Sequence, residues 1–138
     1  MKTEHFSLQD VGAFFAGVPS MHDCSFTVSY QNNTLIVVFD HLEQYFGPAP
    51  SGPWFGVFQK CTVKYRNVKF LDLTLKYGRK EKFFADIVGV LDGKELVMFG
   101  YSVDSARHLI LDFRIGVKKK WWGGILKMTP DMVEYIWE

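Results

Sequence analysis

Two stretches of the sequence bring together residue types that bind zinc. Residues 21–26 are MHDCSF, and residues 40–43 are DHLE. If the segment between them forms a β-hairpin with a two-residue turn, one face of its open end carries four possible zinc ligands: His22, Cys24, His41 and Glu43. The chain has no closely spaced ligand pair such as Cys-x-x-Cys, and a cysteine beside a core ladder commonly serves as a small apolar residue. The four residues are candidate metal ligands, but the sequence favours a structural role, and we expect no metal and no other cofactor.

Signatures of catalysis are missing from the sequence. A Cys24–His41 pair could act as nucleophile and base, but no third group that would orient the histidine and no oxyanion pocket can be identified. Asp112 and Arg114 share the polar side of a strand with His108, where a surface salt bridge is the simpler expectation. There is no Walker loop, no Gly-x-Ser-x-Gly and no His-Glu-x-x-His. We therefore expect no catalytic residues and favour a protein that is not an enzyme.

Charge is distributed unevenly along the chain. Residues 1–59 carry a net charge of −4, residues 60–82 carry +6 and residues 83–138 carry −1, counting Lys, Arg, Asp and Glu. In the basic segment, alternate positions place three cations on one side of a strand: Lys60, Lys64 and Arg66. A row of basic side chains attracts an acidic partner and raises its association rate. We predict that this strand face binds a partner protein, and a solvated face without a role is the alternative.

Residues 117–124, VKKKWWGG, join three lysines to two tryptophans. Lysine can contact phosphate and tryptophan can stack on a base, so nucleic-acid binding is one interpretation. The other is a strand end, at which the lysines keep an edge soluble and one tryptophan packs on the core. No motif of a nucleic-acid-binding module is present. We favour the strand end and include Lys119 and Trp121 among the candidate contacts of a protein partner.

Residues 43–59 contain three of the five prolines and show no regular period, which predicts a long loop. The segment is rich in aromatic residues: Tyr45, Phe46, Trp54, Phe55 and Phe58. So much aromatic surface is not expected to stay in water, so the loop either folds over the core as a flap or contacts a partner. Tyr45, Trp54 and Phe55 are therefore candidate partner contacts, and a small-molecule pocket under the loop is the alternative.

Alternating apolar residues predict strands over much of the chain. Residues 24–41 form the clearest hairpin, because Asn32-Asn33 tolerates the positive φ values of a type I′ turn. That turn sets the cross-strand pairs: Cys24–His41, Phe26–Phe39, Val28–Val37 and Tyr30–Leu35. We expect a β-bulge or a bend near Asn67 and not a hairpin, since a hairpin would place Lys64 against Lys69.

The remaining elements are a second hairpin, a strand and two helices. Asp92-Gly93 is the predicted turn between strands over 83–91 and 94–102, and residues 108–117 alternate as a strand. Ser7 and Thr129 are predicted N-caps of short helices near the two ends, over 7–15 and 129–137. The predicted fold class is α+β and mostly β: an antiparallel sheet of six to eight strands, curled or folded into a sandwich, in a single domain, residues 1–138.

The setting predicted from composition is the cytoplasm. The chain has two cysteines, and its first ten residues contain no apolar run of a secretory signal, which favours a reducing compartment and reduced thiols. No stretch approaches the roughly 20 apolar residues needed to span a membrane. We expect no membrane partner, and the oligomeric state is open.

Residues 21–75 resemble small bacterial β-rich domains of unknown function, several of which are immunity-like proteins encoded beside toxins. The resemblance lies in MHDCSFTVSY and TLIVVFD, in which a His-Asp opens a hairpin, and in the later strand CTVKYRNVKFLDLTL. It implies a bacterial cytoplasmic setting and a binding role, and it transfers no catalytic residue. The expected function is a non-enzymatic binding protein that neutralises a partner protein. The alternative is a small-molecule-binding protein or an enzyme with its pocket under residues 43–59.

Overall fold

The computed structural model describes residues 2–6, 24–48 and 54–138. Within these ranges the chain forms one antiparallel sheet of ten strands and one short helix, which confirms a mostly β fold. In chain order the elements are β1 (Lys2–Phe6), β2 (Ser25–Gln31), β3 (Thr34–Pro48), β4 (Trp54–Arg66), β5 (Lys69–Tyr77), β6 (Lys80–Phe84), α2 (Ile87–Leu91), β7 (Leu96–Val103), β8 (Leu109–Val117), β9 (Lys120–Thr129) and β10 (Met132–Trp137).

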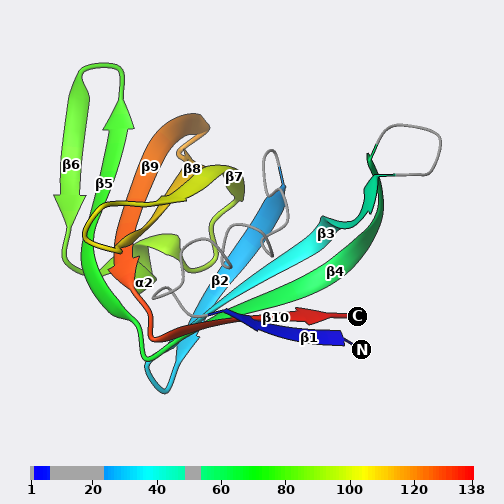
Figure 1. Cartoon of the computed structure of the whole chain (residues 1–138). Helices are drawn as coiled ribbons and strands as arrows, with labels where there is room; N and C mark the ends of the chain where they lie inside the picture. Colours follow the sequence, from blue (N-terminus) through cyan, green and yellow to red (C-terminus); the bar gives the residue numbers. More distant parts are fainter. Residues whose placement is uncertain (1, 7–23, 49–53) are drawn as a thin grey trace.

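The strands lie in the order β1-β10-β4-β3-β2-β7-β8-β9-β5-β6. The sheet curls strongly, and β1 and β6 are its two edge strands (Figure 1). It has more strands than the six to eight predicted, because β1 and β9 were not among the predicted strands and β10 was predicted to be a helix.

The hairpin predicted over residues 24–41 is confirmed in turn and register. Asn32 and Asn33 have φ values of 51° and 58°, as a type I′ turn requires. Three of the four predicted pairs are formed: Phe26–Phe39, Val28–Val37 and Tyr30–Leu35. The fourth, Cys24–His41, is not formed, because β2 begins at Ser25 and its ladder with β3 ends at Phe26–Phe39.

The strand pair β4–β10, near one end of the strand order, continues through a bend into the strand pair β5–β9, near the other end. We call this continuous two-stranded segment the bent ribbon. β4 continues into β5 through Asn67, and β9 continues into β10, so that the two continuous segments pair with each other on both sides of the bend. Asn67 has a φ of 49°, and the Asp131 N–H donates to the Arg66 carbonyl at 2.9 Å. β4 and β5 therefore belong to distant parts of the sheet and do not form a hairpin, which confirms the predicted bend.

The C-terminal helix predicted over residues 129–137 is wrong. Residues 132–137 form β10 between β1 and β4, and its inward side chains are buried: Val133, Tyr135 and Trp137. β-Branched and aromatic side chains suit such a pleated, buried surface, and pairing on both edges outweighs the local helix-start signal of Thr129-Pro130. The helix predicted over residues 7–15 lies outside the described residues.

The strand predicted over residues 83–91 is also wrong beyond the end of β6. Asp86 caps α2, because its Oδ1 accepts a hydrogen bond from the Gly89 N–H at 3.1 Å. Asp92-Gly93 then leads from this helix into β7, with Gly93 at a φ of 69°. Ile87 and Leu91 are buried, so the helix contributes to the core between β2 and β5.

The core lies on the inner face of the curl. The predicted alternation in residues 108–117 is confirmed, since four alternate side chains of β8 are buried: Leu109, Leu111, Phe113 and Ile115. Burial raises the pKa of Tyr101 to about 12 and raises that of Tyr65 further above its usual value. Both phenols are therefore neutral at physiological pH.

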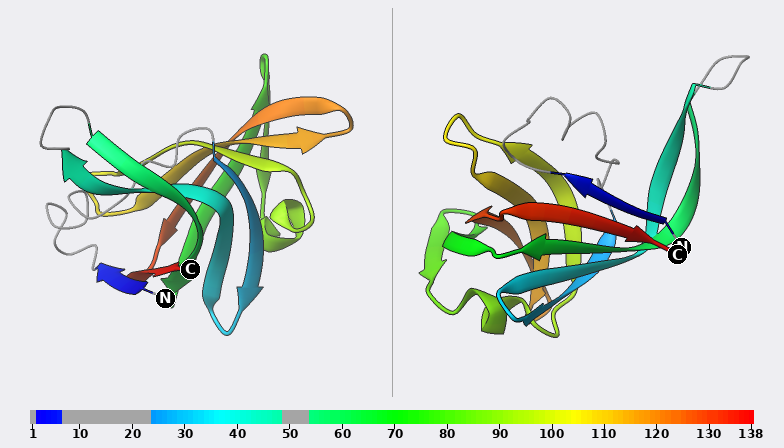
Figure 2. Two further views of the ribbon diagram at one scale, coloured as in Figure 1. Left: turned by 90° about the vertical axis from the view of Figure 1, so that its right-hand side faces the viewer. Right: turned by 60° about the horizontal axis from the view of Figure 1, so that its bottom comes forward.

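The loop predicted over residues 43–59 is wrong in most of its length. β3 extends to Pro48 and β4 begins at Trp54, and these two residues are paired. In the described part of the chain, residues 42–48 and 54–59 pair only with each other, and Figure 2 shows them projecting beyond the rest of the sheet. We call these two segments the β3–β4 arm. Residues 49–53, at its tip, lie outside the described residues.

Candidate binding site

The four candidate metal ligands are only partly described. His22 lies outside the described residues, and Glu43 is placed by its backbone in β3. The ladder between β2 and β3 ends at Phe26–Phe39, and a β-bulge then places Asp40 and His41 opposite a single residue of β4. His41 is exposed and Cys24 is half-buried before β2. Among the side chains that the structure describes, no three His, Cys, Asp or Glu residues form a metal-binding group.

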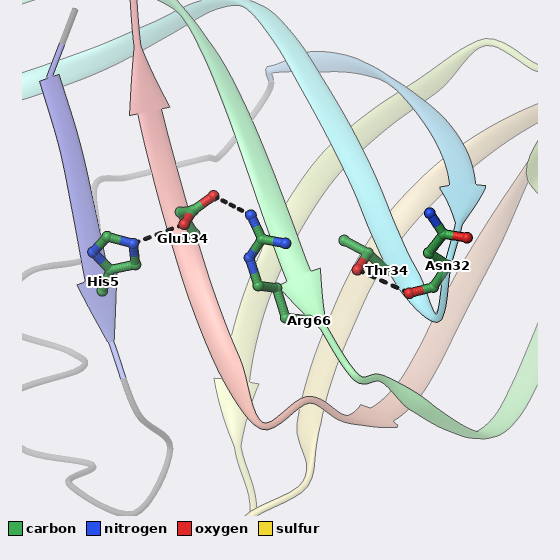
Figure 3. A network of polar contacts seen from close by, with 5 residues as sticks. All are labelled: His5, Asn32, Thr34, Arg66 and Glu134. Carbon is green, nitrogen blue, oxygen red and sulfur yellow. Dashed lines mark hydrogen bonds and ion pairs between the residues drawn. The ribbon is translucent and has the colours of Figure 1, made fainter.

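The predicted basic strand face contains an ion-pair network. Lys60 is exposed on β4, whereas Lys64 and Arg66 are half-buried. The Arg66 Nη2 donates to Glu134 Oε1 at 2.8 Å, and the His5 Nε2 lies 2.7 Å from Glu134 Oε2 (Figure 3). Burial alone would raise the pKa of Glu134, but these two hydrogen bonds outweigh it and hold that pKa below its usual value. Glu134 thus offsets part of the positive charge of this face.

A denser group of cations lies at the tips of two neighbouring hairpins. The β5–β6 tip and the β8–β9 tip meet because β5 pairs with β9. Together residues 76–82 and 117–122 hold seven of the sixteen Lys and Arg residues of the chain and only one acidic residue, Glu81. The seven cations are all exposed: Lys76, Arg79, Lys80, Lys82, Lys118, Lys119 and Lys120. We call these two segments the basic end.

The backbone of the basic end is unusual at its β8–β9 turn. Val117 pairs with Lys120, so Lys118 and Lys119 are the two central residues. Their φ values are 48° and 63°. Such turns favour Asn-Gly, because each left-handed residue other than Gly or Asn costs about 1–2 kcal/mol. The chain therefore holds two lysines where lysine is conformationally unfavourable.

Aromatic residues border the same cations. Trp122 packs on the core, and its ring centroid lies 5.4 Å from that of Tyr77. The Lys120 Nζ lies 5.3 Å from the Tyr77 ring centroid, within the range of a cation–π interaction. Trp121 points the opposite way and is 49% exposed. The interpretation in which one of the two tryptophans packs on the core is confirmed, although the lysines lie at a hairpin turn and not on a sheet edge.

Asp112 and Arg114 form the salt bridge that their spacing predicted, with Arg114 Nη1 3.1 Å from Asp112 Oδ1. The guanidinium also lies over the ring of Phe99, 4.4 Å from its centroid. His108 does not join them, since its Nδ1 lies 3.1 Å from Asp104 Oδ2. The Asp104 carboxylate accepts the His108 backbone N–H, which lowers the pKa of Asp104. These contacts order the outer face of β8 and the turn before it.

The predicted contact residues thus fall on three separate regions. Lys60, Lys64 and Arg66 lie on the strand face, and Lys119 and Trp121 lie at the basic end. Tyr45, Trp54 and Phe55 belong by their backbone to the β3–β4 arm. Four cations of the β5–β6 tip were not singled out from the sequence, because their proximity to residues 118–120 depends on the pairing of β5 with β9. Two signals were available: the positive charge of residues 60–82, which includes these four cations, and the combination of lysines with aromatic residues in both segments.

Comparisons with known proteins give no relative: no family model, no curated protein and no solved structure matches this chain. The described residues include no helix with the length and apolar character needed to cross a membrane.

Proposed function

We propose that this chain is a non-enzymatic binding protein that recognises an acidic surface of a partner protein with its basic end. Neutralisation of that partner is the role that the resemblance to immunity-like domains would imply. The proposal places the main contact at the two hairpin tips, and the strand face and the β3–β4 arm are secondary contacts.

The strained turn is the observation that carries the proposal. Backbone strain persists where the surrounding structure imposes it, and it is concentrated at functional sites. Lys118 and Lys119 occupy left-handed positions that Asn and Gly would occupy at lower cost. A solubilising role alone would be met equally well by lysines at unstrained positions nearby, so the strain supports a need for charge at this corner.

The arrangement favours a protein partner over nucleic acid. Single-stranded nucleic acid is generally bound along a basic groove with several exposed aromatic rings on which successive bases stack. At the basic end, Trp122 packs on the core, and one face of the partly exposed Tyr77 ring is already occupied by the Lys120 ammonium. Trp121 is half exposed beside a compact cluster of cations. A single exposed tryptophan surrounded by charge is typical of an interface hot spot.

The β3–β4 arm supports a second point of contact. It projects from the sheet and carries Tyr45, Trp54 and Phe55 in its sequence (Figure 2). A two-stranded hairpin is marginally stable on its own in water, so contact with a partner would stabilise it. Lys60 lies at the base of the arm, next to Gln59, and would add positive charge there.

A matched pair of charge reversals tests the proposal. The basic-end variant carries Lys80→Glu and Lys119→Glu, and the strand-face variant carries Lys60→Glu and Lys64→Glu, so that both change the net charge equally. Tagged wild type and both variants are used to capture partners from a nuclease-treated lysate of the source organism. Each captured protein is then purified, and its affinity is measured by calorimetry at low and moderate salt.

The expected result is a purified partner whose affinity falls by a factor of about ten or more in the basic-end variant, since two interfacial charges are reversed. The strand-face variant should lose less. The proposal is contradicted if the basic-end variant binds as tightly as wild type. It is also contradicted if nuclease treatment abolishes capture, because the ligand would then be nucleic acid.

A further inference from the structure

We propose that the basic end also contains a small-molecule site, which binds an anion with a short apolar tail. The site is a hollow of about 300 Å³ between the β5–β6 and β8–β9 hairpins. Six described residues line it: Leu75, Lys82, Val117, Lys118, Lys120 and Trp122. This inference does not depend on a protein partner, since the ligand would bind to the isolated chain.

The floor of the hollow is apolar and fixed. Leu75 is 4% exposed and belongs to the core, and Val117 and Trp122 pack against that core. The centroid of the Tyr77 ring lies 5.4 Å from that of Trp122, so the two aromatic rings pack against each other. A preformed apolar floor favours a hydrocarbon tail, because burying the tail removes apolar surface of both ligand and protein from water.

The rim of the hollow is cationic. Three of the six lining residues are lysines, and none of the six is acidic. The Lys120 ammonium is held over the Tyr77 ring, and Lys118 is fixed in the two-residue turn. Ammonium groups at the edge of an apolar surface attract a carboxylate more strongly than they would in bulk water. The charge pattern therefore selects an anionic head at the mouth and an apolar tail on the floor.

The size of the hollow limits the ligand. A water molecule occupies about 30 Å³ in the liquid, so 300 Å³ corresponds to about ten non-hydrogen atoms. A medium-chain monocarboxylate such as octanoate has this size. Inorganic phosphate would leave the floor in contact with water, and a neutral alcohol of the same length would make no use of the lysines.

Titration of the isotope-labelled full chain, followed by NMR, tests the proposal. The probes are octanoate, octanol and inorganic phosphate at equal concentration, and the signals are the Trp122 indole N–H and the methyl groups of Leu75 and Val117. Octanoate should shift all three with a Kd on the order of 1 mM, as expected for a ligand of about ten atoms. Octanol and phosphate should give much smaller shifts.

Three variants separate the floor from the rim. Lys82→Gln with Lys118→Gln should weaken octanoate binding about tenfold, and Val117→Thr should weaken it about threefold by making the floor more polar. The matched control is Arg79→Gln with Lys80→Gln, which removes the same amount of charge from the basic end but does not alter the lining. Equal shifts with octanol or phosphate, or an equal loss in the control, would overturn the proposal.

Discussion

Lys118 and Lys119 have a backbone conformation that lysine rarely adopts. At the scale of single residues, the stability of the fold and the proposed binding function therefore place opposite demands on these two positions. Both have positive φ values at the centre of a two-residue turn. In this region the Cβ atom lies too close to the following carbonyl oxygen. Gly has no Cβ, and Asn offsets the cost because its short polar side chain can hydrogen-bond locally. If the charges serve binding, this turn should be suboptimal for stability, as functional sites often are.

Replacing the two residues by Lys118→Asn and Lys119→Gly should therefore stabilise the fold while weakening partner binding. We expect the free energy of unfolding to rise by about 1–2 kcal/mol, measured by urea denaturation. Arg79→Gln with Lys80→Gln is the control, because it removes the same amount of charge from the basic end without changing a residue that has a positive φ. An unchanged midpoint in the variant with Lys118→Asn and Lys119→Gly would show that the turn is not strained.

Glu134 is the residue at which charge and stability are most closely coupled. Its side chain is 11% exposed and accepts hydrogen bonds from Arg66 and His5 in strands on either side. Its folded pKa is below its unfolded pKa, so the ionised form stabilises the fold above the unfolded value, about 4.3. This contribution is lost as the pH falls through the folded pKa.

Glu134→Gln should lower the free energy of unfolding at pH 7 by about 1 kcal/mol, a modest value because Arg66 is 43% exposed. The difference from wild type should shrink as the pH falls through the lowered folded pKa, where the wild-type carboxyl group also becomes protonated. Urea denaturation at several pH values measures both effects. Glu138→Gln is the control, and a difference that persists unchanged at low pH would contradict the explanation.

At the scale of elements, the glycine pair of β9 shows how the two faces of a strand differ. A Cβ at Gly124 would lie 2.5 Å from the ring of Phe113, which is buried on the neighbouring strand. A Cβ at Gly123 would approach no atom closer than 3.6 Å, on the outer face. Phe113 therefore fills the space over Gly124, in the manner of an aromatic ring covering a glycine in a sheet.

Gly124→Ala should destabilise the protein by about 2 kcal/mol, because the Phe113 ring must move within a packed core. Gly123→Ala should change stability by less than about 0.5 kcal/mol. Thermal and urea unfolding of the two variants give the comparison directly. Similar losses in both would show that glycine is needed for backbone conformation and not for space.

The elements that could be predicted from the sequence are those specified by local chemistry. The hairpin over residues 24–41 combines strict alternation with two asparagines that accept positive φ, and its register followed. The bend at Asn67 was predicted because a hairpin there would have placed the like charges of Lys64 and Lys69 opposite each other. A hairpin turn was predicted at Asp92-Gly93, but the same dipeptide can follow the end of a helix, as it does after α2. The sequence signal for that helix is Asp86, which is its N-cap.

At the scale of the whole molecule, non-local pairing determines what the sequence could not predict. Thr129-Pro130 has the local features of a helix start, yet residues 132–137 become a strand because β1 and β4 lie on both sides of them. Likewise, the basic end is formed by segments about forty residues apart that only the pairing of β5 with β9 brings together. Local periodicity carries no information about such partners.

The bent ribbon makes a prediction about cooperativity. β4-β5 and β9-β10 each run through both halves of the sheet, so neither half can lose its strands without disrupting the other. Trp137 is buried in the half that contains β10, and Trp122 packs on the core in the half that contains β9. Two variants that each retain one of these tryptophans, with the other three replaced by Phe, report on the halves separately.

Both variants should unfold in urea with their fluorescence change coincident with the loss of far-ultraviolet circular dichroism, as a two-state transition requires. Introducing Asn67→Val at the bend should lower the stability of both halves together by about 1–2 kcal/mol, because a β-branched residue is disfavoured at a φ of 49°. A transition at Trp122 that precedes the one at Trp137, or a bend variant that affects only one of them, would show that the ribbon does not couple the two halves.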